Sequence, residues 1–208
     1  MTSTPDIRHD RAPDEIGMRL VDEAARLLAE HGPSGLSLRR VAAASGTSTM
    51  AVYTRFGDKQ GLLAAMYREG FRRLGARLAE AAQPPDLQAP LPGLAAVGRA
   101  YRESALASPF LYALMFGPHP AVAGPGPDGG AAIAEAAEAT YRPLEAGVRE
   151  AVAGGLLVGD PARIARHLWT VAHGAVSLEL SGRLAPDEDP AALYDDALLL
   201  AALPFLAG

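Results

Sequence analysis

Residues 36–56 combine side chains that can contact DNA with the spacing that a helix-turn-helix requires. Two short helices that cross closely need small residues at the crossing and a glycine at the tight turn, and Ala42, Ala43 and Gly46 meet these needs. Apolar side chains must also anchor both helices on a preceding helix. The candidate anchors are Leu38, Val41, Val52 and Phe56. The pattern therefore predicts a compact helical motif that can read DNA.

The outer face of the second short helix carries hydroxyl, apolar and cationic groups, which suit base edges, thymine methyls and phosphates in a major groove. Flanking cations and the backbone amides at helix N-termini can bind further phosphates. Arg55 fits either a bidentate contact to guanine or a phosphate contact. The candidate DNA-binding residues are Ser37, Arg39, Ser48, Thr49, Met50, Tyr53, Thr54, Arg55 and Lys59. By spacing alone, two short helices of an ordinary bundle are an equally good interpretation.

The net charge of −5 conceals an uneven distribution of charge along the chain. Residues 1–80 hold 12 Lys and Arg against 10 Asp and Glu, whereas residues 81–208 hold 7 against 14. Within residues 35–60, four cations are opposed only by Asp58. A mildly basic first part and an acidic second part suit a chain in which one domain binds DNA and another has a different task.

The other residues that could carry chemistry argue against an enzyme. The chain has no cysteine, which excludes disulfides, thiolate catalysis and cysteine-bound zinc. His167 and His173 are six residues apart, about 240° around a helix, so one helix cannot present both to one metal ion. No paired-carboxylate or HExxH pattern occurs. We expect no catalytic residue, metal or cofactor, and rank a small helical enzyme with His173 or His167 as its base far below a DNA-binding protein.

The composition predicts an all-helical protein in which about nine helices position these residues. Ala and Leu dominate, while the β-branched and aromatic residues that favour strands are sparse. Apolar spacing and the positions of Gly and Pro place helices at 14–31, 37–45, 48–55, 59–82, 91–107, 109–116, 130–153, 161–182 and 190–207. A stretch rich in Gly and Pro predicts a mobile loop at 117–130.

From Asp14 to Arg73 the sequence resembles the N-terminal domain of the tetracycline-repressor (TetR) family. The matching elements, in order, are Gly35-Leu36-Ser37, Val41-Ala42, Ser45-Gly46, Val52-Tyr53, Arg55-Phe56, Asp58-Lys59 and Leu62-Leu63. The resemblance implies that Tyr53 and Lys59 contact phosphates and that the positions of Thr49, Met50, Thr54 and Arg55 face the groove. Family members often have an aromatic residue and a histidine where this chain has Thr54-Arg55, so no particular operator sequence carries over.

The second part of the chain resembles one C-terminal subclass of that family, named for its Trp–His–Gly motif. Trp169, His173 and Gly174 carry the motif, and residues 101–116 fit the same subclass. The resemblance implies a helical domain that binds a ligand and forms a dimer. His173 has two interpretations, a core residue with its hydrogen bonds satisfied or a ligand-binding group, and the first is favoured about two to one.

A small, largely apolar effector is expected between these helices, because the aromatic and methionine side chains that would line a cavity are clustered. The candidate pocket residues are Met66, Tyr101, Phe110, Tyr112, Met115, Phe116, Tyr141, Trp169 and His173. Stripes of such residues more often form core, and that alternative stays open. The last two helices have apolar ends whose leucines would be exposed in a single chain. A second copy of the chain would cover them, so these ends predict a homodimer interface. Its candidates are Leu178, Leu193, Leu199, Leu200 and Leu203.

We therefore expect a disordered tail at 1–13, a helix-turn-helix domain at 14–57 and a helical ligand-binding and dimerisation domain at 58–208, in which 58–82 is a connecting helix. Its function would be that of a repressor released from a palindromic operator by its effector. A helical binding module without DNA is the remaining alternative. The polar N-terminus shows no signal peptide and Pro204 interrupts the longest apolar run, so a cytoplasmic location is expected.

Overall fold

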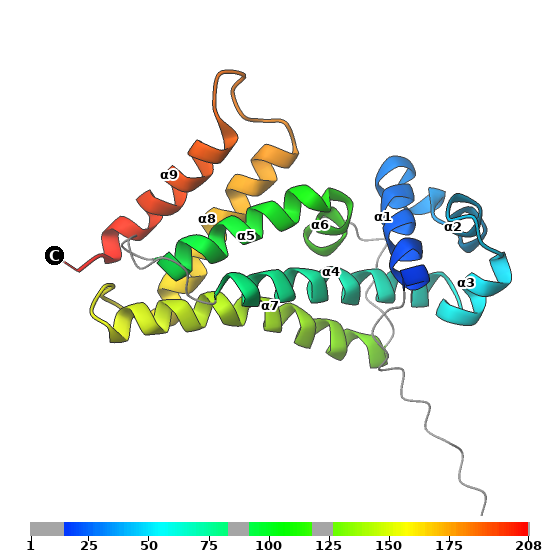
Figure 1. The fold of residues 1–208 in the computed structure, drawn as a ribbon, viewed down its shortest axis with the longest axis horizontal. Helices are drawn as coiled ribbons and strands as arrows, with labels where there is room; N and C mark the ends of the chain where they lie inside the picture. Colours follow the sequence, from blue (N-terminus) through cyan, green and yellow to red (C-terminus); the bar gives the residue numbers. More distant parts are fainter. Residues whose placement is uncertain (1–14, 83–91, 118–126, 208) are drawn as a thin grey trace, which may run out of the picture. The chain divides into compact units, whose positions relative to one another are not determined.

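A computed structural model describes residues 15–82, 92–117 and 127–207, and within these ranges the chain forms nine α-helices (Figure 1). The helices are α1 (Glu15–Gly35), α2 (Leu38–Ala44), α3 (Thr49–Phe56), α4 (Lys59–Ala81), α5 (Pro92–Ala107), α6 (Pro109–Phe116), α7 (Pro127–Ala153), α8 (Pro161–Leu180) and α9 (Pro190–Ala202), followed by the 3₁₀ turn η1 (Leu203–Phe205). The predicted all-helical fold is confirmed. Among the described residues, no helix is both long enough and apolar enough to span a bilayer.

The chain divides into two compact units, Met1–Met66 and Tyr67–Gly208, and the division falls inside α4. We call them the N-terminal and C-terminal units. The domain boundary expected at residue 57 stays a prediction. The expected disordered tail at 1–13 lies outside the described residues.

In the N-terminal unit, α1 packs on α2 and α2 packs on α3. Apolar residues spaced three or four apart form a stripe along α1, and its members Leu20, Ala24, Leu27 and Leu28 are buried, whereas Ile16 at the start of the stripe is exposed. Val41 of α2 and Val52 of α3 are fully buried. Gly32 in α1 and Gly46 between α2 and α3 have φ angles of +67° and +63°, a conformation that glycine adopts without strain. The turn predicted at Gly46 is therefore confirmed.

Side-chain caps explain where α2, α3 and α4 begin. The Oγ atoms of Ser37 and Ser48 and the Oδ1 atom of Asp58 each accept a hydrogen bond from the backbone amide three residues further on, at 3.3, 3.1 and 2.8 Å. Each bond satisfies an amide that would otherwise lack a partner in the first turn of its helix. Asp160 and Asp189 cap α8 and α9 in a similar way, with a proline at the first helical position of each.

The C-terminal unit is arranged around α8, which packs against α5, α7 and α9 (Figure 1). Ile164 and Val176 on α8 are fully buried in its core. Gly98 allows α5 and α9 to approach closely, since a Cβ atom built there would lie 2.6 Å from Cδ1 of Leu198. Beside this contact, the Tyr194 hydroxyl of α9 donates a 2.7 Å hydrogen bond to the Gly98 carbonyl oxygen.

Two predicted boundaries in this unit are wrong. α7 begins at Pro127, so the loop expected at 117–130 ends earlier, and its residues 118–126 lie outside the described ranges. A proline is tolerated in the first turn of a helix, where its missing N–H needs no partner. The last helix ends at Ala202 instead of 207 because Pro204 cannot donate the next helical hydrogen bond. The chain then forms η1 and an antiparallel bridge between Leu157 and Leu206.

An ion pair between Arg102 and Glu179 joins α5 to α8. The guanidinium donates two hydrogen bonds to the carboxylate, at 2.8 and 2.6 Å, and the two side chains are 19% and 13% exposed. Paired bonds of this geometry are strong, and the loss of one partner leaves the other charge largely buried.

We expect Arg102→Ala to lower the free energy of unfolding by about 2 kcal/mol, because Glu179 would lose both bonds while staying largely buried. Urea unfolding measures this loss. Arg77→Ala is the matched control, since its 3.3 Å pair with Glu103 is more than half exposed on both sides and should contribute less than about 1 kcal/mol. Equal losses in the two variants would contradict this role for the pair.

Candidate DNA-binding helix and ligand cavity

The exposed face of α3 presents the side chains that the sequence predicts for DNA contact. Val52 is fully buried, whereas Met50 and Tyr53 are 73% and 50% exposed. Thr54 and Arg55 are also exposed, and Thr49 is half-buried at the start of the helix. A short helix with one buried anchor and large exposed side chains on its other face can enter a major groove without losing its packing.

The predicted residues outside α3 lie at the starts of helices and on α2. Arg39 is exposed on α2, and Lys59 is half-buried at the first position of α4. The hydroxyls of Ser37 and Ser48 already accept the capping bonds of α2 and α3. A hydroxyl that accepts a bond keeps its own proton to donate, so either serine can still bind a phosphate oxygen. Within the N-terminal unit, the structure therefore places all nine predicted residues on α2, α3 and their caps or at the start of α4.

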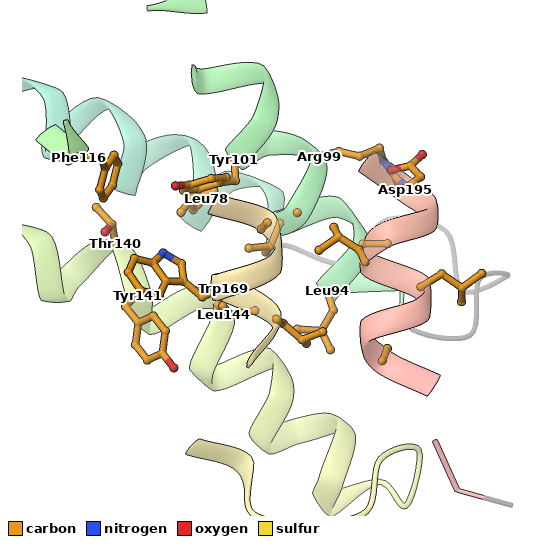
Figure 2. Close-up of a pocket in the computed structure, with 18 of the residues that line it drawn as sticks. Leu78, Leu94, Arg99, Tyr101, Phe116, Thr140, Tyr141, Leu144, Trp169 and Asp195 are labelled. Carbon is orange, nitrogen blue, oxygen red and sulfur yellow. The ribbon is translucent and has the colours of Figure 1, made fainter. Parts of the chain in front are cut away.

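A cavity of about 310 Å³ lies in the C-terminal unit between α4, α5, α7, α8 and α9 (Figure 2). We call it the apolar cavity, because aliphatic and aromatic side chains form most of its wall. Its leucine and valine lining consists of Leu78, Leu94, Val97, Leu144, Leu168, Leu198, Leu199 and Leu206. A cavity of this size and character suits a small organic ligand.

Four predicted pocket residues line the apolar cavity, namely Tyr101, Phe116, Tyr141 and Trp169. The other five do not. Tyr112 and Met115 line a second cavity, and three residues line neither one: Met66 is fully buried, Phe110 is partly exposed on α6, and His173 lies behind Trp169. Sequence reasoning missed the leucines, since a leucine that faces a cavity has the same helical spacing as one in a filled core.

Polar groups lie at opposite ends of the apolar cavity. Arg99 of α5 and Asp195 of α9 lie together at one end, and Thr140 and Trp169 lie near the other (Figure 2). The ring of Trp169 makes an edge-to-face contact with Tyr141, with 6.4 Å between the ring centroids. The cavity thus offers aromatic surface at one end and both signs of charge at the other, with an apolar middle.

His173 belongs to a hydrogen-bonded cluster behind the cavity wall, which we call the tyrosine–histidine cluster. Its Nδ1 atom lies 3.0 Å from the Tyr101 hydroxyl and 2.8 Å from the Tyr112 hydroxyl, and the two hydroxyls are 3.2 Å apart. Burial lowers the pKa of His173 and raises the pKa of both tyrosines, which keeps all three groups neutral. Trp169 stacks on the His173 ring with 5.6 Å between centroids.

The leucines predicted for a dimer interface lie mostly on the surface of the C-terminal unit. Leu178, Leu199, Leu200 and Leu203 are exposed, and Leu193 is half-buried. Leu199 also lines the apolar cavity. Among the described residues, no group of three or more histidines, aspartates or glutamates could hold a metal ion.

The chain is similar to known proteins in both of its units. Residues 20–66 match the family described as bacterial regulatory proteins, tetR family, and residues 94–200 match the tetracyclin repressor-like C-terminal domain. The HTH-type transcriptional regulator Rv1816 of Mycobacterium tuberculosis is 27% identical over 210 residues, which cover 88% of this chain and 89% of that protein.

Two further similarities differ in how much they cover. The HTH-type transcriptional repressor AcnR of Corynebacterium glutamicum is 35% identical over 68 residues, so this chain spans only 36% of that relative's length. These residues make up 33% of this chain. The solved structure of a Rhodococcus sp. RHA1 protein of unknown function is 30% identical, with a TM-score of 0.72, and the match covers 98% of this chain and 100% of that one.

The sequence resemblance to the TetR N-terminal domain is thereby confirmed, and the second domain match alone spans half of the chain. The chain has an N-terminal helix-turn-helix with an exposed outer face, followed by a helical C-terminal domain. It belongs to the TetR family of DNA-binding transcriptional regulators, a family without enzymatic activity.

Proposed function

We propose that the protein is a homodimeric repressor that leaves a palindromic operator when a small, largely apolar effector occupies the apolar cavity. The observation that carries this proposal is the cavity itself, about 310 Å³ within the C-terminal unit and lined mainly by leucines and aromatic rings. A regulator of this family whose second domain encloses such a space has a place to sense a molecule as well as a surface to bind DNA.

The DNA contacts that we propose divide into two kinds. The exposed tips of Met50, Thr54 and Arg55 on α3 suit base edges and thymine methyls, while Tyr53 and Lys59 suit phosphates. Ser37, Ser48 and Arg39 add phosphate contacts at the helix starts and on α2. Residues 14–57 then act as the DNA-binding domain and 58–208 as the sensing and dimerising domain, in the cytoplasm, where the operator is found.

The effector class follows from the lining of the apolar cavity. Leucines form most of the wall, and Tyr141 and Trp169 offer ring faces and edges at one end. We assign the C-terminal unit to the Trp–His–Gly subclass, and within it His173 supports the wall through Tyr101. The effector can shift the protein away from its DNA-binding state only as far as its affinity differs between the two states.

The dimer that we propose covers the exposed leucines of α8, α9 and η1. Leu200 is 64% exposed, and Leu178 and Leu203 are each close to half exposed. Apolar surface of this kind at the ends of two neighbouring helices is covered at low cost by the same surface of a second copy. A twofold dimer presents two α3 helices to two half-sites, which is why we expect a palindromic operator.

Arg55→Ala/Lys59→Ala should lower the affinity for DNA at least about tenfold, because a base or phosphate contact and a second phosphate contact are both removed. The substrate is genomic DNA fragments selected by the wild-type protein, and fluorescence anisotropy at several salt concentrations gives the affinity. The salt dependence should weaken as well. Arg142→Ala/Arg149→Ala, two exposed arginines of α7, is the control. Full affinity in the first double variant would refute the DNA-binding assignment.

Ala95→Phe should lower the affinity for N-phenyl-1-naphthylamine, an uncharged apolar fluorescent probe, by about tenfold. Ala95 lines the apolar cavity, so the added ring occupies part of the space for the probe. Probe fluorescence measures binding, and Ala96→Phe is the matched control, since Ala96 follows on α5 and does not line the cavity. If both variants bound the probe like the wild type, the probe would not enter this cavity.

Leu200→Glu/Leu203→Glu should convert the dimer to a monomer at micromolar concentration, because each carboxylate would be desolvated in the interface. Sedimentation velocity measures the mass, and anisotropy measures the accompanying loss of operator affinity. Leu106→Glu, a partly exposed leucine on α5, is the control and should stay dimeric. A wild-type protein that sediments as a monomer would exclude the dimer, and a dimeric double variant would place the interface elsewhere.

A further inference from the structure

The charged side chains of the apolar cavity lie together at one end of it, on two different helices. Arg99 of α5 and Asp195 of α9 are the charged residues among its described lining, and both are exposed (Figure 2). Leu199 of α9 also lines the cavity and is 57% exposed. Because lining residues on both helices reach the solvent, the cavity opens between α5 and α9. We call this opening the mouth of the cavity.

The opposite end of the cavity is aromatic and holds no charged side chain among the described lining residues. Tyr141 and Trp169 meet there edge to face. Thr140 lies at the same end but is only 9% exposed, and its hydroxyl donates a 2.7 Å hydrogen bond to the Ala137 carbonyl oxygen within α7. A ligand head group that forms several hydrogen bonds is therefore better placed at the mouth, with the apolar body of the ligand pointing inward.

Both charges at the mouth are accessible to a ligand. Arg99 and Asp195 are exposed, so a polar head group can replace water on each of them at small cost. The next arginine of α5, Arg102, does not line the cavity. Its pKa is raised mainly by Glu179, which accepts two hydrogen bonds from its guanidinium, while Asp195 adds a smaller electrostatic effect. Arg102 is thus held by Glu179, and Arg99 is the cation that a ligand meets at the mouth.

A cation and an anion side by side favour a head group without net charge. A carboxylate would bind Arg99 but be repelled by Asp195, and an ammonium group would bind Asp195 but be repelled by Arg99. A primary amide avoids both repulsions, since its oxygen can accept a hydrogen bond from the guanidinium while its NH₂ group donates one to the carboxylate. An uncharged head group also costs less to desolvate beside an apolar wall.

We propose that the effector of the apolar cavity is an uncharged amphipathic molecule whose head group both donates and accepts hydrogen bonds, as a primary amide does. The head group binds Arg99 and Asp195 at the mouth, and the apolar body extends toward Trp169. This inference rests on the proposed function, which requires a small and largely apolar ligand but leaves its polar group open. Arg99 and Asp195 are then the residues that determine specificity for the head group.

The test compares three probes that share a phenyl ring and a four-carbon chain and differ in the head group: 4-phenylbutanamide, 4-phenylbutyrate and 4-phenylbutylamine. Each is titrated into the full chain without DNA at neutral pH in a calorimeter. We expect the amide to bind at least about threefold more tightly than either charged probe. Trp169, the single tryptophan of the chain, lines this cavity, so its emission should change as the heat signal saturates.

Two single variants should reverse the order of the probes. Asp195→Asn removes the anion of the mouth, so the carboxylate should become the tightest of the three, and Arg99→Gln removes the cation, so the ammonium should become the tightest. Both residues are exposed, which favours folded variants. Asp196→Asn on α9 and Arg163→Gln on α8 change the net charge by the same amounts at exposed positions outside the lining, and these matched controls should keep the wild-type order.

Several results would overturn the proposal. They are a charged probe that binds the wild type as tightly as the amide, an unchanged order in either Asp195→Asn or Arg99→Gln, and the same reversal in the matched control. Heat without a change in Trp169 emission would place the probes elsewhere and overturn it too. So would a failure of all three probes to bind, because the amide has both features that the cavity and its mouth are proposed to recognise.

N-phenyl-1-naphthylamine distinguishes such a failure from a failure of the proposed function. If this probe binds the wild type and is weakened by Ala95→Phe, the apolar cavity is a ligand site, and only the assignment of the head group is wrong. If it does not bind there, the proposed effector site itself fails. Neither result depends on whether the protein binds an operator.

Discussion

The C-terminal unit depends on a contact at which three of its helices meet through hydrogen bonds, the tyrosine–histidine cluster. Tyr101 comes from α5, Tyr112 from α6 and His173 from α8, and their polar atoms lie 2.8 to 3.2 Å apart. Neutral, buried groups of this kind are stable only while each keeps its partners. The contact therefore fixes the position of α6, a helix of eight residues, relative to the two longer helices.

The same contact forms part of the walls of both cavities. Tyr101 lines the apolar cavity and Tyr112 lines the second cavity, which lies between α4, α5 and α6, while His173 contacts both tyrosines. On α6, Phe116 faces the first cavity and Met115 the second. A small helix held by a few hydrogen bonds thus separates two spaces of different chemistry. The Nδ1 atom of His173 lies within hydrogen-bond distance of two protein hydroxyls and Trp169 stacks on its ring, which supports the interpretation of His173 as a core residue over that of a ligand-binding group.

Local signals in the sequence predict most of the fold. Ser37, Ser48 and Asp58 cap the helices that their positions indicate, and Gly46 makes the turn between α2 and α3. These features are local, since a cap or a turn depends on residues that are close in sequence. The two wrong helix boundaries each lie at a proline, which can either begin a helix or end one. Pro127 starts a helix although its surroundings indicate a loop, and Pro204 ends one inside an apolar run.

The candidate sites were predictable to different degrees for a physical reason. Residues on α3 face outward because Val52 must be buried, so one apolar anchor determines the exposed face. A cavity depends instead on where several helices fail to fill the space between them, which no single helix encodes. The leucines of the apolar cavity look like core leucines for this reason. Likewise, Glu69 and Arg73 have the spacing of an ordinary surface ion pair, and only the burial of Glu69 distinguishes them.

The residues that hold α3 in the fold differ from those that we expect to determine its DNA specificity. Val52 is the one fully buried residue in this eight-residue helix, and Ser48 caps it through its side chain. Thr54 and Arg55, where the chain departs from the residues common in its family, are exposed and take no part in that packing. If these two residues contact bases, as we propose, changes there would alter which bases are recognised while the helix keeps Val52 as its anchor and Ser48 as its cap. The residues that build the helix and those proposed to read the operator are then different, which is why the fold and the family follow from the sequence and the operator does not.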